Sequence, residues 1–490
     1  MTETAAIIGG GVIGGGWAAR FLLNGWNVNL FDPDPHVEAK LAPVLKQARH
    51  ALPSLLDVAL PEEGQLTFCA ELKDAVAGAA WIQESAPERL EAKQRLLAQI
   101  EAACAPDAII GSSTSGFRPS QLREGAQHTD RILVAHPFNP VYLIPLVELV
   151  APDANDGVIA TAKSVLTGLG MFPLHLRKEI DAHVADRFLE AVWREALWLV
   201  KDGIATTEEI DDAIRMGFGM RWAQMGLFDT YRTAGGEAGM RHFMAQFGPA
   251  LKWPWTRLMD VPDFDDDLVD LIAGQSDQQS GHLTISEMLK ARDENLVAMM
   301  RALKYRDWGA GAVLNEQERS IRSGTVLAAR AGDLRDVSQP ILTVRRAVPL
   351  DWTDYNGHMN EAKYLQAFGD ATDRMMEMVG CDADYIATGG SYFTAETHIR
   401  HVDEVCAGTI IEVRTQMLMG QGKKMHLWHE MLAGKRLLAT GEHFLLHVSL
   451  ETRRPSEPAA HIVEALERIS AAHANLPRPD GAGRYVGQRP

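Results

Sequence analysis

The chain has 490 residues, which is too long for one hydrophobic core and predicts about three folding units. Its content of 46% apolar and 23% charged residues is ordinary for a globular protein. The formal net charge of −17 argues against nucleic acid or an anionic membrane as a partner, because no basic stripe offsets it.

The amino-terminal part alternates short apolar runs with helical stretches, up to about residue 173. This alternation is typical of βαβ units on a parallel sheet. We therefore expect an α/β domain over residues 1–181. Its strand candidates are residues 5–9, 27–32, 81–84, 109–112 and 131–136.

The middle of the chain lacks strand-like runs, and its apolar residues recur at helical spacing. We expect an all-α domain over residues 182–330, followed by a polar linker at 331–340. The next segments alternate apolar and polar residues around one clear helix at 360–379, which predicts an α+β domain over 341–455. Residues 456–490 read as a partly mobile tail with one helix candidate at 459–472.

A glycine-rich loop connects the first predicted strand to the first helix. Gly9 permits a tight turn, Gly11 lets the backbone approach a pyrophosphate, and Gly14 allows close packing of helix on strand. Free amides of the helix N-terminus then face the phosphates. Asp32 ends the second strand, where a carboxylate binds ribose hydroxyls and repels a 2′-phosphate. The loop predicts a Rossmann domain that binds NAD rather than NADP through Gly9, Gly10, Gly11, Val12, Ile13, Gly14 and Asp32.

A histidine and a glutamate follow the last predicted strand of this domain. His136 begins the sequence His-Pro-Phe-Asn-Pro, and Glu148 lies inside an apolar run. Oxidation of an alcohol by hydride transfer needs a base for the hydroxyl proton, and a histidine oriented by a carboxylate suits that role. A carboxylate among apolar residues also needs a partner. Taken alone, His136 is equally compatible with capping a loop.

Residues 4–320 resemble the 3-hydroxyacyl-CoA dehydrogenase superfamily. The shared order is the glycine loop, Ser-Ser-Thr-Ser, His-Pro-Phe-Asn-Pro, Leu-Val-Glu and a helical domain. The resemblance implies that His136 is the catalytic base and Glu148 its orienting partner. It also implies that Ser115 contacts the substrate hydroxyl and the nicotinamide, and that Glu88 and Lys93 contact the cofactor.

The chain departs from this superfamily at two positions. Ser113 stands where the superfamily usually has Asn, and Asp186 replaces the Asn of an Asn-Arg-Leu motif. An ionised Asp only accepts hydrogen bonds, so it favours a cationic substrate over an acyl-CoA. Pairing of Asp186 with Arg187 or Arg194 is an equally weighted alternative.

The helical domain carries many aromatic residues. We expect most of them to lie in its core, and some to form a cage for a quaternary ammonium group through cation–π attraction. The stretch 219–223 is similar to the lambda-crystallin/carnitine branch of the superfamily, whose substrates are small hydroxy acids. That similarity implies substrate contacts from Trp222 and a bidentate pairing of Arg221 with a carboxylate. The aromatic residues are Trp193, Trp198, Trp222, Trp253, Trp255, Phe218, Tyr231 and Phe243.

A second motif, Asp-Tyr-Asn-Gly-His-Met-Asn, occupies residues 354–360. Read from its residues alone, it could be a helix cap with a turn. With the helix after it, the motif resembles the 4-hydroxybenzoyl-CoA thioesterase-like hotdog family over residues 341–450. The resemblance implies that Asp354 is a catalytic base or nucleophile, and that Gly357 amides polarise the thioester. It also implies that His358 and Asn360 shape the loop and that the protein is a homodimer.

The four cysteines lack a Cys-x-x-Cys spacing and predict reduced thiols with no metal site. The apolar start, residues 5–23, has no basic flank and reads as strand, turn and helix rather than as a signal peptide. No other run reaches the roughly twenty apolar residues that span a bilayer. We therefore expect a cytoplasmic protein. The cysteines are Cys69, Cys104, Cys381 and Cys406.

The two resemblances together imply a bifunctional enzyme of carnitine degradation. It would oxidise L-carnitine to 3-dehydrocarnitine with NAD and hydrolyse betainyl-CoA to glycine betaine and CoA. Two alternatives stay open at this point. The first domain could act on another 3-hydroxy acid, such as L-gulonate or a 3-hydroxyacyl-CoA. The hotdog segment could be a non-catalytic module for dimerisation or acyl-CoA binding.

Overall fold

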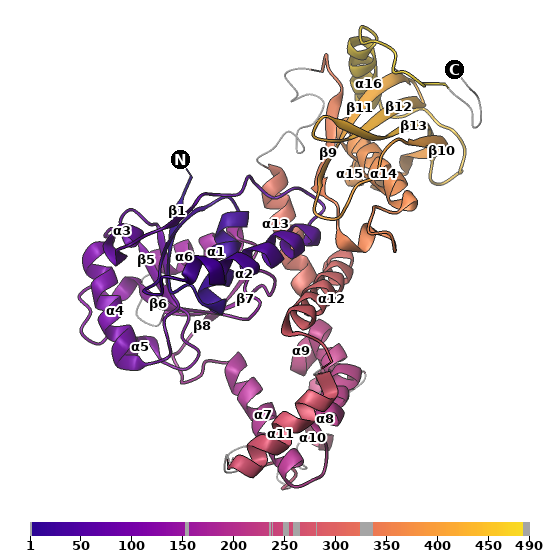
Figure 1. Cartoon of the computed structure of the whole chain (residues 1–490). Helices are drawn as coiled ribbons and strands as arrows, with labels where there is room; N and C mark the ends of the chain where they lie inside the picture. The colour runs from indigo at the N-terminus through magenta and orange to yellow at the C-terminus, as the bar shows by residue number, and fades with distance from the viewer. Residues whose placement is uncertain are drawn as a thin grey trace. The chain divides into compact units, whose positions relative to one another are not determined.

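The computed structural model describes residues 2–151, 156–234, 237, 239–247, 254–257, 265–280, 282–323 and 337–483. The chain forms two compact units (Figure 1). The first comprises Met1–Ala48 and Gly64–Asn315, and the second comprises Arg49–Glu63 and Glu316–Pro490. Most of the predicted linker at 331–340 lies outside the described residues.

An eight-stranded sheet forms the base of the first unit, with the strand order β3-β2-β1-β4-β5-β6-β7-β8. Neighbours are parallel except β6 and β7, which are antiparallel. In such an order ligands bind at the carboxyl ends of the strands, where the order reverses at β1 and β4. The strands are β1 (Thr4–Ile8), β2 (Asn27–Phe31), β3 (Leu66–Phe68), β4 (Trp81–Glu84), β5 (Ile109–Ser112), β6 (Ile132–Pro137), β7 (Leu146–Val150) and β8 (Phe172–Leu176).

The expected Rossmann-type α/β fold is therefore confirmed, and five of these strands were predicted to within a residue. The sequence did not predict β3, β7 or β8. Helices connect the strands, and their apolar faces complete a core with Ile82, Ile110 and Val134 at its centre. The helices are α1 (Val12–Leu23), α2 (Val37–Ala51), α3 (Leu72–Val76), α4 (Leu90–Ala103), α5 (Pro119–Leu122) and α6 (Asp156–Gly168).

The chain after β8 is helical, as predicted: within residues 177–323 the described segments contain helices and no strand. None of the helices in the described ranges is long and apolar enough to cross a membrane. The helices that begin in this region are α7 (Ala185–Lys201), α8 (Thr207–Ala213), α9 (Gly219–Ala234), α10 (Gly239–Phe247), α11 (Asp266–Ser280), α12 (Ile285–Tyr305) and α13 (Ala310–Ser323).

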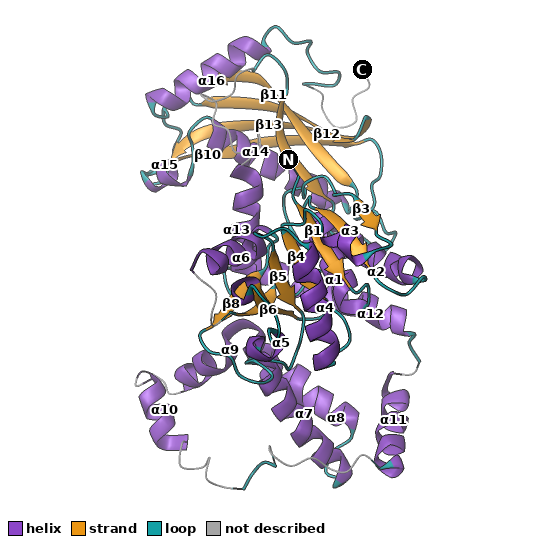
Figure 2. Cartoon of the chain, turned by 90° about the vertical axis from the view of Figure 1, so that its left-hand side faces the viewer, coloured by secondary structure: helices purple, strands orange, loops and turns teal. Residues whose placement is uncertain are grey.

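The second unit is an α+β fold on a five-stranded antiparallel sheet, in the order β10-β13-β12-β11-β9. Figure 2 shows these strands side by side, with α16 along them. This architecture confirms the expected α+β domain with one long helix, α14. The elements are β9 (Ile341–Ala347), α14 (Glu361–Met378), α15 (Ala383–Ala387), β10 (Gly390–His401), β11 (Ile410–Gln421), β12 (Lys424–Ala433), β13 (Arg436–Ser449) and α16 (Ala460–His473).

Local sequence explains why α14 and α16 form. Asn360 caps α14 by accepting the Ala362 amide at 3.0 Å. Residues of α16 that recur at helical spacing, Ile462, Leu466 and Ile469, are completely buried. The expected tail, residues 456–490, begins with ordered structure: α16 contributes to the core of the second unit, and of this stretch residues 484–490 lie outside the described residues.

A buried polar network connects α14 to the sheet. The Thr372 hydroxyl lies 3.1 Å from Nε2 of His429 and 3.4 Å from Nδ1 of His443. Nδ1 of His429 lies 2.8 Å from the Thr415 hydroxyl. Burial lowers the pKa of His443 to about 4, and burial with the neighbouring His443 lowers the pKa of His429 well below its usual value. Both imidazoles are therefore neutral at pH 7.

We expect the second unit to lose stability as the pH falls from 6.5 to 4. The pKa of His443 is lower in the folded chain than the ordinary 6.5, so the unfolded state binds more protons in this window. The full effect of that shift is about 3 kcal/mol, present above pH 6.5 and lost by pH 4. Calorimetry of the full chain measures it. A His443→Phe variant should show a weaker pH dependence, and an unchanged dependence would contradict this assignment.

Candidate functional site

The glycine loop closes the end of β1 and begins α1. Gly9 has φ +100°, and a Cβ at this position would lie 2.7 Å from the Ser85 carbonyl oxygen. A Cβ on Gly14 would lie 1.8 Å from the Gly9 carbonyl oxygen. By contrast, a Cβ on Gly11 would meet nothing within 4 Å. The open side of Gly11 therefore leaves room for a pyrophosphate to approach the backbone and the first amides of α1.

Asp32 lies directly after β2 and fixes this loop. Its Oδ2 accepts the Gly10 amide at 2.7 Å, and its Oδ1 accepts the Asp34 amide at 2.8 Å. The carboxylate is thus held beside the glycine loop, where a dinucleotide places its adenosine ribose. Only glycine fits at position 10 beside this contact, because a Cβ there would lie 2.2 Å from the Val37 side chain.

Lys93 and Glu88 occupy different environments, although the sequence predicted that both contact the cofactor. Lys93 is 1% exposed, and its Nζ lies 2.9 Å from Glu84, 3.4 Å from Glu88 and 3.0 Å from the Ala86 carbonyl oxygen. Its ammonium is therefore already engaged and supports the loop after β4. Glu88 stays half exposed and accepts the Gly116 amide at 3.2 Å.

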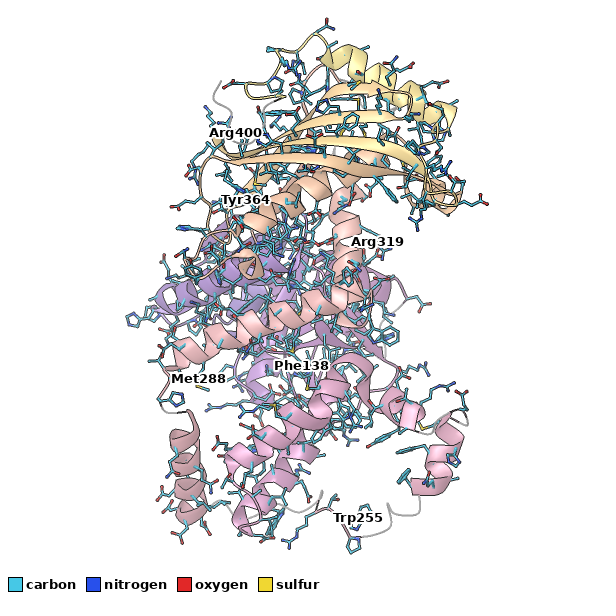
Figure 3. All side chains as sticks on the ribbon, turned by 90° about the vertical axis from the view of Figure 1, so that its right-hand side faces the viewer. Phe138, Trp255, Met288, Arg319, Tyr364 and Arg400 are labelled. Carbon is cyan, nitrogen blue, oxygen red and sulfur yellow. The ribbon has the colours of Figure 1, made fainter. Side chains whose placement is uncertain are left out.

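His136 and Glu148 face one another across β6 and β7. The antiparallel register pairs these two residues directly, and His136 Nδ1 lies 3.0 Å from Glu148 Oε2. Both side chains are buried, Glu148 completely. The predicted partner of the buried carboxylate is therefore confirmed. Phe138, labelled in Figure 3, lies beside the imidazole with ring centroids 4.8 Å apart.

The start of α7 stabilises the Glu148 carboxylate. Backbone amides of Val184 and Ala185 each donate to its Oε1 at 2.9 Å. Burial alone would raise the pKa of Glu148, but the hydrogen bonds from His136 and these amides outweigh burial and hold the pKa below its usual value. Glu148 is therefore an anion that fixes the tautomer of His136, with the proton on Nδ1 and Nε2 free to accept.

Asp186 approaches the opposite side of the same imidazole. Its Oδ2 lies 3.7 Å from His136 Nε2, and burial raises its pKa. The alternative pairing with Arg187 or Arg194 is not observed among the described residues, and the Arg194 guanidinium lies 3.7 Å from Glu190. The Asp186 carboxyl group thus lies near Nε2, the nitrogen of His136 that accepts a proton.

Ser115 is exposed in the loop after β5, between Thr114 and Gly116. Ser113, in contrast, is occupied inside the fold: its hydroxyl accepts from Gln83 Nε2 at 2.8 Å and from Trp17 Nε1 at 3.2 Å. Of the two serines, Ser115 is the one that a ligand can reach.

The prediction that most aromatic residues of the helical domain are buried is wrong. Trp193 is 55% exposed and Trp255 66% exposed. Arg221 and Trp222 are also exposed on α9, and neither contacts the His136–Glu148 pair in any described interaction. Trp253 lies outside the described residues. The helical pattern that suggested a core instead marks a face that the described residues leave exposed.

The motif at 354–360 forms a tight loop before α14. Asp354 Oδ1 accepts the Asn356 amide at 2.8 Å, and the Asp354 carbonyl accepts the Gly357 amide at 3.0 Å. Gly357 has φ +80°, a conformation that glycine adopts without strain. In this conformation the Gly357 amide is bonded within the turn, and its use as an oxyanion donor stays a prediction. His358 Nδ1 lies 3.3 Å from Glu404, and Asn360 rather than Asp354 caps the helix.

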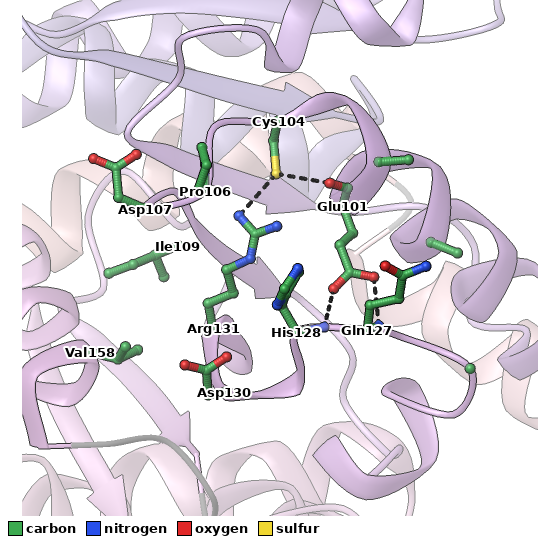
Figure 4. A pocket seen from close by; sticks show the side chains of 13 residues that line it. Glu101, Cys104, Pro106, Asp107, Ile109, Gln127, His128, Asp130, Arg131 and Val158 are labelled. Atoms are coloured by element: carbon green, nitrogen blue, oxygen red, sulfur yellow. Dashed lines mark hydrogen bonds between the residues drawn. The ribbon is translucent and has the colours of Figure 1, made fainter.

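A separate cavity of about 540 Å³ lies at the amino end of β5 (Figure 4). Arg131 in its wall donates to Cys104 Sγ at 3.3 Å. The cofactor loop lies at the carboxyl ends of the strands, so this cavity is distinct from the site around His136.

Three families match successive parts of the chain. Residues 4–180 match the NAD binding domain of 3-hydroxyacyl-CoA dehydrogenase, and residues 183–261 match its C-terminal domain. Residues 348–466 match the thioesterase-like superfamily.

Similar proteins match nearly the full length of the chain. A protein of Ruegeria pomeroyi named L-carnitine dehydrogenase/betainyl-CoA thioesterase is 67% identical over 99% of each chain. One of the same name from Agrobacterium fabrum is 53% identical over 98% of this chain and 97% of its own. An L-carnitine dehydrogenase of Pseudomonas putida is 51% identical over 62% of this chain and 94% of its own. Among solved structures, an NAD+ dependent FHMPC 5-dehydrogenase matches 62% of this chain and 99% of its own, with TM-score 0.53 and 28% identity.

Proposed function

The chain belongs to the L-carnitine dehydrogenase/betainyl-CoA thioesterase family, and on this premise we propose that it catalyses both reactions. The first unit oxidises L-carnitine to 3-dehydrocarnitine with NAD. The second unit hydrolyses betainyl-CoA to glycine betaine and CoA. The observation that carries the proposal is full-length identity of 67%, together with the hydrogen-bonded His136–Glu148 pair.

NAD fits the residues that form the glycine loop. The amides of Val12 and Ile13 and the open side of Gly11 receive the pyrophosphate, and Asp32 receives the ribose hydroxyls. Glu88 remains accessible beside this site, and Lys93 supports it from within. When bound, NAD supplies the acceptor for the hydride that leaves C3 of the substrate.

His136 acts as the general base of the oxidation. Its Nε2 takes the proton of the 3-hydroxyl while the C3 hydride leaves, and the new carbonyl forms. Glu148, held by His136 and two amides, stabilises the imidazolium that results. Ser115 orients the substrate hydroxyl.

Asp186 recognises the cationic substrate. Trimethylammonium offers no hydrogen-bond donor, so a carboxylate and an aromatic face are the groups that attract it. Asp186 lies at the accepting side of His136, and Phe138 lies beside that imidazole. The expected substrate contacts of Arg221 and Trp222, both exposed on α9, remain proposals.

Replacing Asp186 with Asn should raise the KM for carnitine about tenfold, because a neutral amide of the same shape loses the attraction for the cation. The KM for NAD should stay unchanged. Glu190→Gln, which removes an acidic group one helical turn away, is the matched control and should behave like the wild type. Steady-state kinetics measures both. A variant that keeps its KM for carnitine would favour another hydroxy acid as substrate.

Asp354 supplies the carboxylate for thioester hydrolysis in the second unit. It acts either as a base toward water that attacks the thioester carbon, or as a nucleophile that forms a mixed anhydride, which water then hydrolyses to glycine betaine. In both routes the C–S bond breaks, the sulfur takes a proton, and CoA leaves as a thiol. The hydrogen bond from the Asn356 amide fixes the carboxylate, and His358 and Asn360 hold the loop in place.

A substrate panel decides between this proposal and its alternative. Initial rates of NAD reduction are compared with L-carnitine, L-gulonate and 3-hydroxybutyryl-CoA. Activity with carnitine and none with the CoA ester supports the proposal. Activity with only the CoA ester would overturn it.

We also propose a cytoplasmic homodimer. One face of α7 exposes Phe188, Leu189, Val192 and Trp193, a patch that a second copy can cover. All four cysteines are free thiols, which suits a reducing compartment. Sedimentation of the full chain should give the mass of two chains, and a single-chain mass at micromolar concentration would contradict the dimer.

A further inference from the structure

Five consecutive residues, 182–186, contact the His136–Glu148 pair and both neighbours of Ser115. We name this stretch the clamp segment. It lies between β8 and α7. Val184 and Ala185 donate to Glu148, and Asp186 approaches His136. The first two residues of the clamp segment contact the loop after β5, which carries Ser115.

The clamp segment holds that loop on both sides of Ser115. The Ala182 amide donates to the Gly116 carbonyl at 3.1 Å. Nε2 of His183 lies 3.2 Å from the Thr114 carbonyl oxygen, which can only accept, so this nitrogen carries the proton. Ser115 is therefore fixed in a position set by the two residues on either side of it.

His183 is completely buried, and its backbone is strained. Ala182 has φ +58° and His183 φ +49°, a conformation that residues with a side chain rarely adopt. Nδ1 of His183 is buried and has no hydrogen-bond partner among the described residues. Among the described residues, the ring therefore makes one hydrogen bond, to the Thr114 carbonyl oxygen. This bond offsets the energetic cost of the strained backbone.

The ring of His183 also lies close to the proposed base, with centroids 5.6 Å apart. Burial lowers its pKa, so it is neutral beside His136. A neutral neighbour allows His136 to become an imidazolium, whereas a cation at this distance would oppose it.

We propose that His183 is a positioning residue for the oxidation. By binding the Thr114 carbonyl it holds the clamp segment in its strained conformation, so that Ser115 and the Val184 and Ala185 amides keep their places around the His136–Glu148 pair. It does not itself touch the substrate. This inference rests on the proposed dehydrogenase function.

The test compares four variants of the full chain with the wild type. His183→Gln places an N–H donor at the reach of Nε2, so it should retain activity within a few-fold of the wild type. His183→Phe fills the volume without a donor, and His183→Gly relieves the strain without a donor. Both should lower kcat with carnitine about 100-fold, the effect of misplacing reacting groups by about 1 Å. Ala182→Gly relieves strain next to the intact hydrogen bond from His183 to Thr114 and should match the wild type.

Two further readouts separate positioning from a general loss of structure. The affinity for NAD, measured by fluorescence, should stay unchanged in all variants. The acid limb of the pH profile of kcat/KM should move in His183→Phe, because its Glu148 loses the two amides that set the electrostatics of His136. Equal kcat in His183→Phe and His183→Gln would overturn the proposal, as would a fall in kcat without displacement of the acid limb. An inactive wild type would instead refute the dehydrogenase function.

Discussion

The variant His136→Gln loses carnitine-dependent NAD reduction, with kcat lowered by a factor of about 10² to 10⁴. A glutamine fills a similar volume but cannot take the hydroxyl proton, and it lacks the Nδ1 that lies 3.0 Å from the Glu148 carboxylate. Spectrophotometry of NADH formation measures the loss. Hydrolysis of betainyl-CoA by the same preparation stays at the wild-type rate, because the second unit is unchanged.

His128→Gln is the matched control for this variant. His128 lies in the wall of the cavity at the opposite edge of the sheet, and its replacement should leave both activities unchanged. Retention of more than a tenth of the wild-type kcat in His136→Gln would show that another group is the base.

The variant Asp354→Asn loses CoA release from betainyl-CoA, again by about 10² to 10⁴-fold. Its amide oxygen can still accept the Asn356 amide, so the loop keeps its shape while the basic or nucleophilic oxygen is removed. Release of CoA is followed with a thiol reagent. Carnitine oxidation is the internal control and should be unaffected.

Asp351→Asn, three residues earlier on the exposed side of the same segment, is the matched control and should hydrolyse normally. Unchanged CoA release in Asp354→Asn would contradict the role of this carboxylate. The hotdog segment would then fit a non-catalytic module for dimerisation or acyl-CoA binding.

The parts of the fold that the sequence predicts are those with local causes. At Gly14 the steric limit is local, because a Cβ there would meet the Gly9 carbonyl oxygen, whereas the limit at Gly9 comes from Ser85 after β4. The strand before the glycine loop and the helix after it have clear apolar periodicity. The motif at 354–360 was recognised because its turn and the cap at Asn360 are also local.

Non-local pairing accounts for most of what the sequence did not predict. The strand β7 is antiparallel to β6, and only this register places Glu148 opposite His136. The amides of Val184 and Ala185, which donate to Glu148, lie more than thirty residues later in the chain. Every residue except proline has a backbone amide, so the residue types at these positions do not indicate this role. His183 was missed for the same reason, because its positive φ is a property of the fold.

Exposure of the helical domain was mispredicted for a different reason. An apolar stripe indicates that a helix face is covered, but it does not show whether residues of the same chain or of another chain cover it. Trp193 and Phe188 are exposed in the single chain, which is the pattern of a surface that a second copy covers.

One mixed assay tests the central claim most directly. A single preparation of the full chain receives NAD, L-carnitine and betainyl-CoA, and NADH and free CoA thiol are recorded together. We predict that both products form, and that NADH forms equally when betainyl-CoA is omitted. Absence of carnitine-dependent NADH, or absence of CoA release, would contradict the assignment of two activities to this chain.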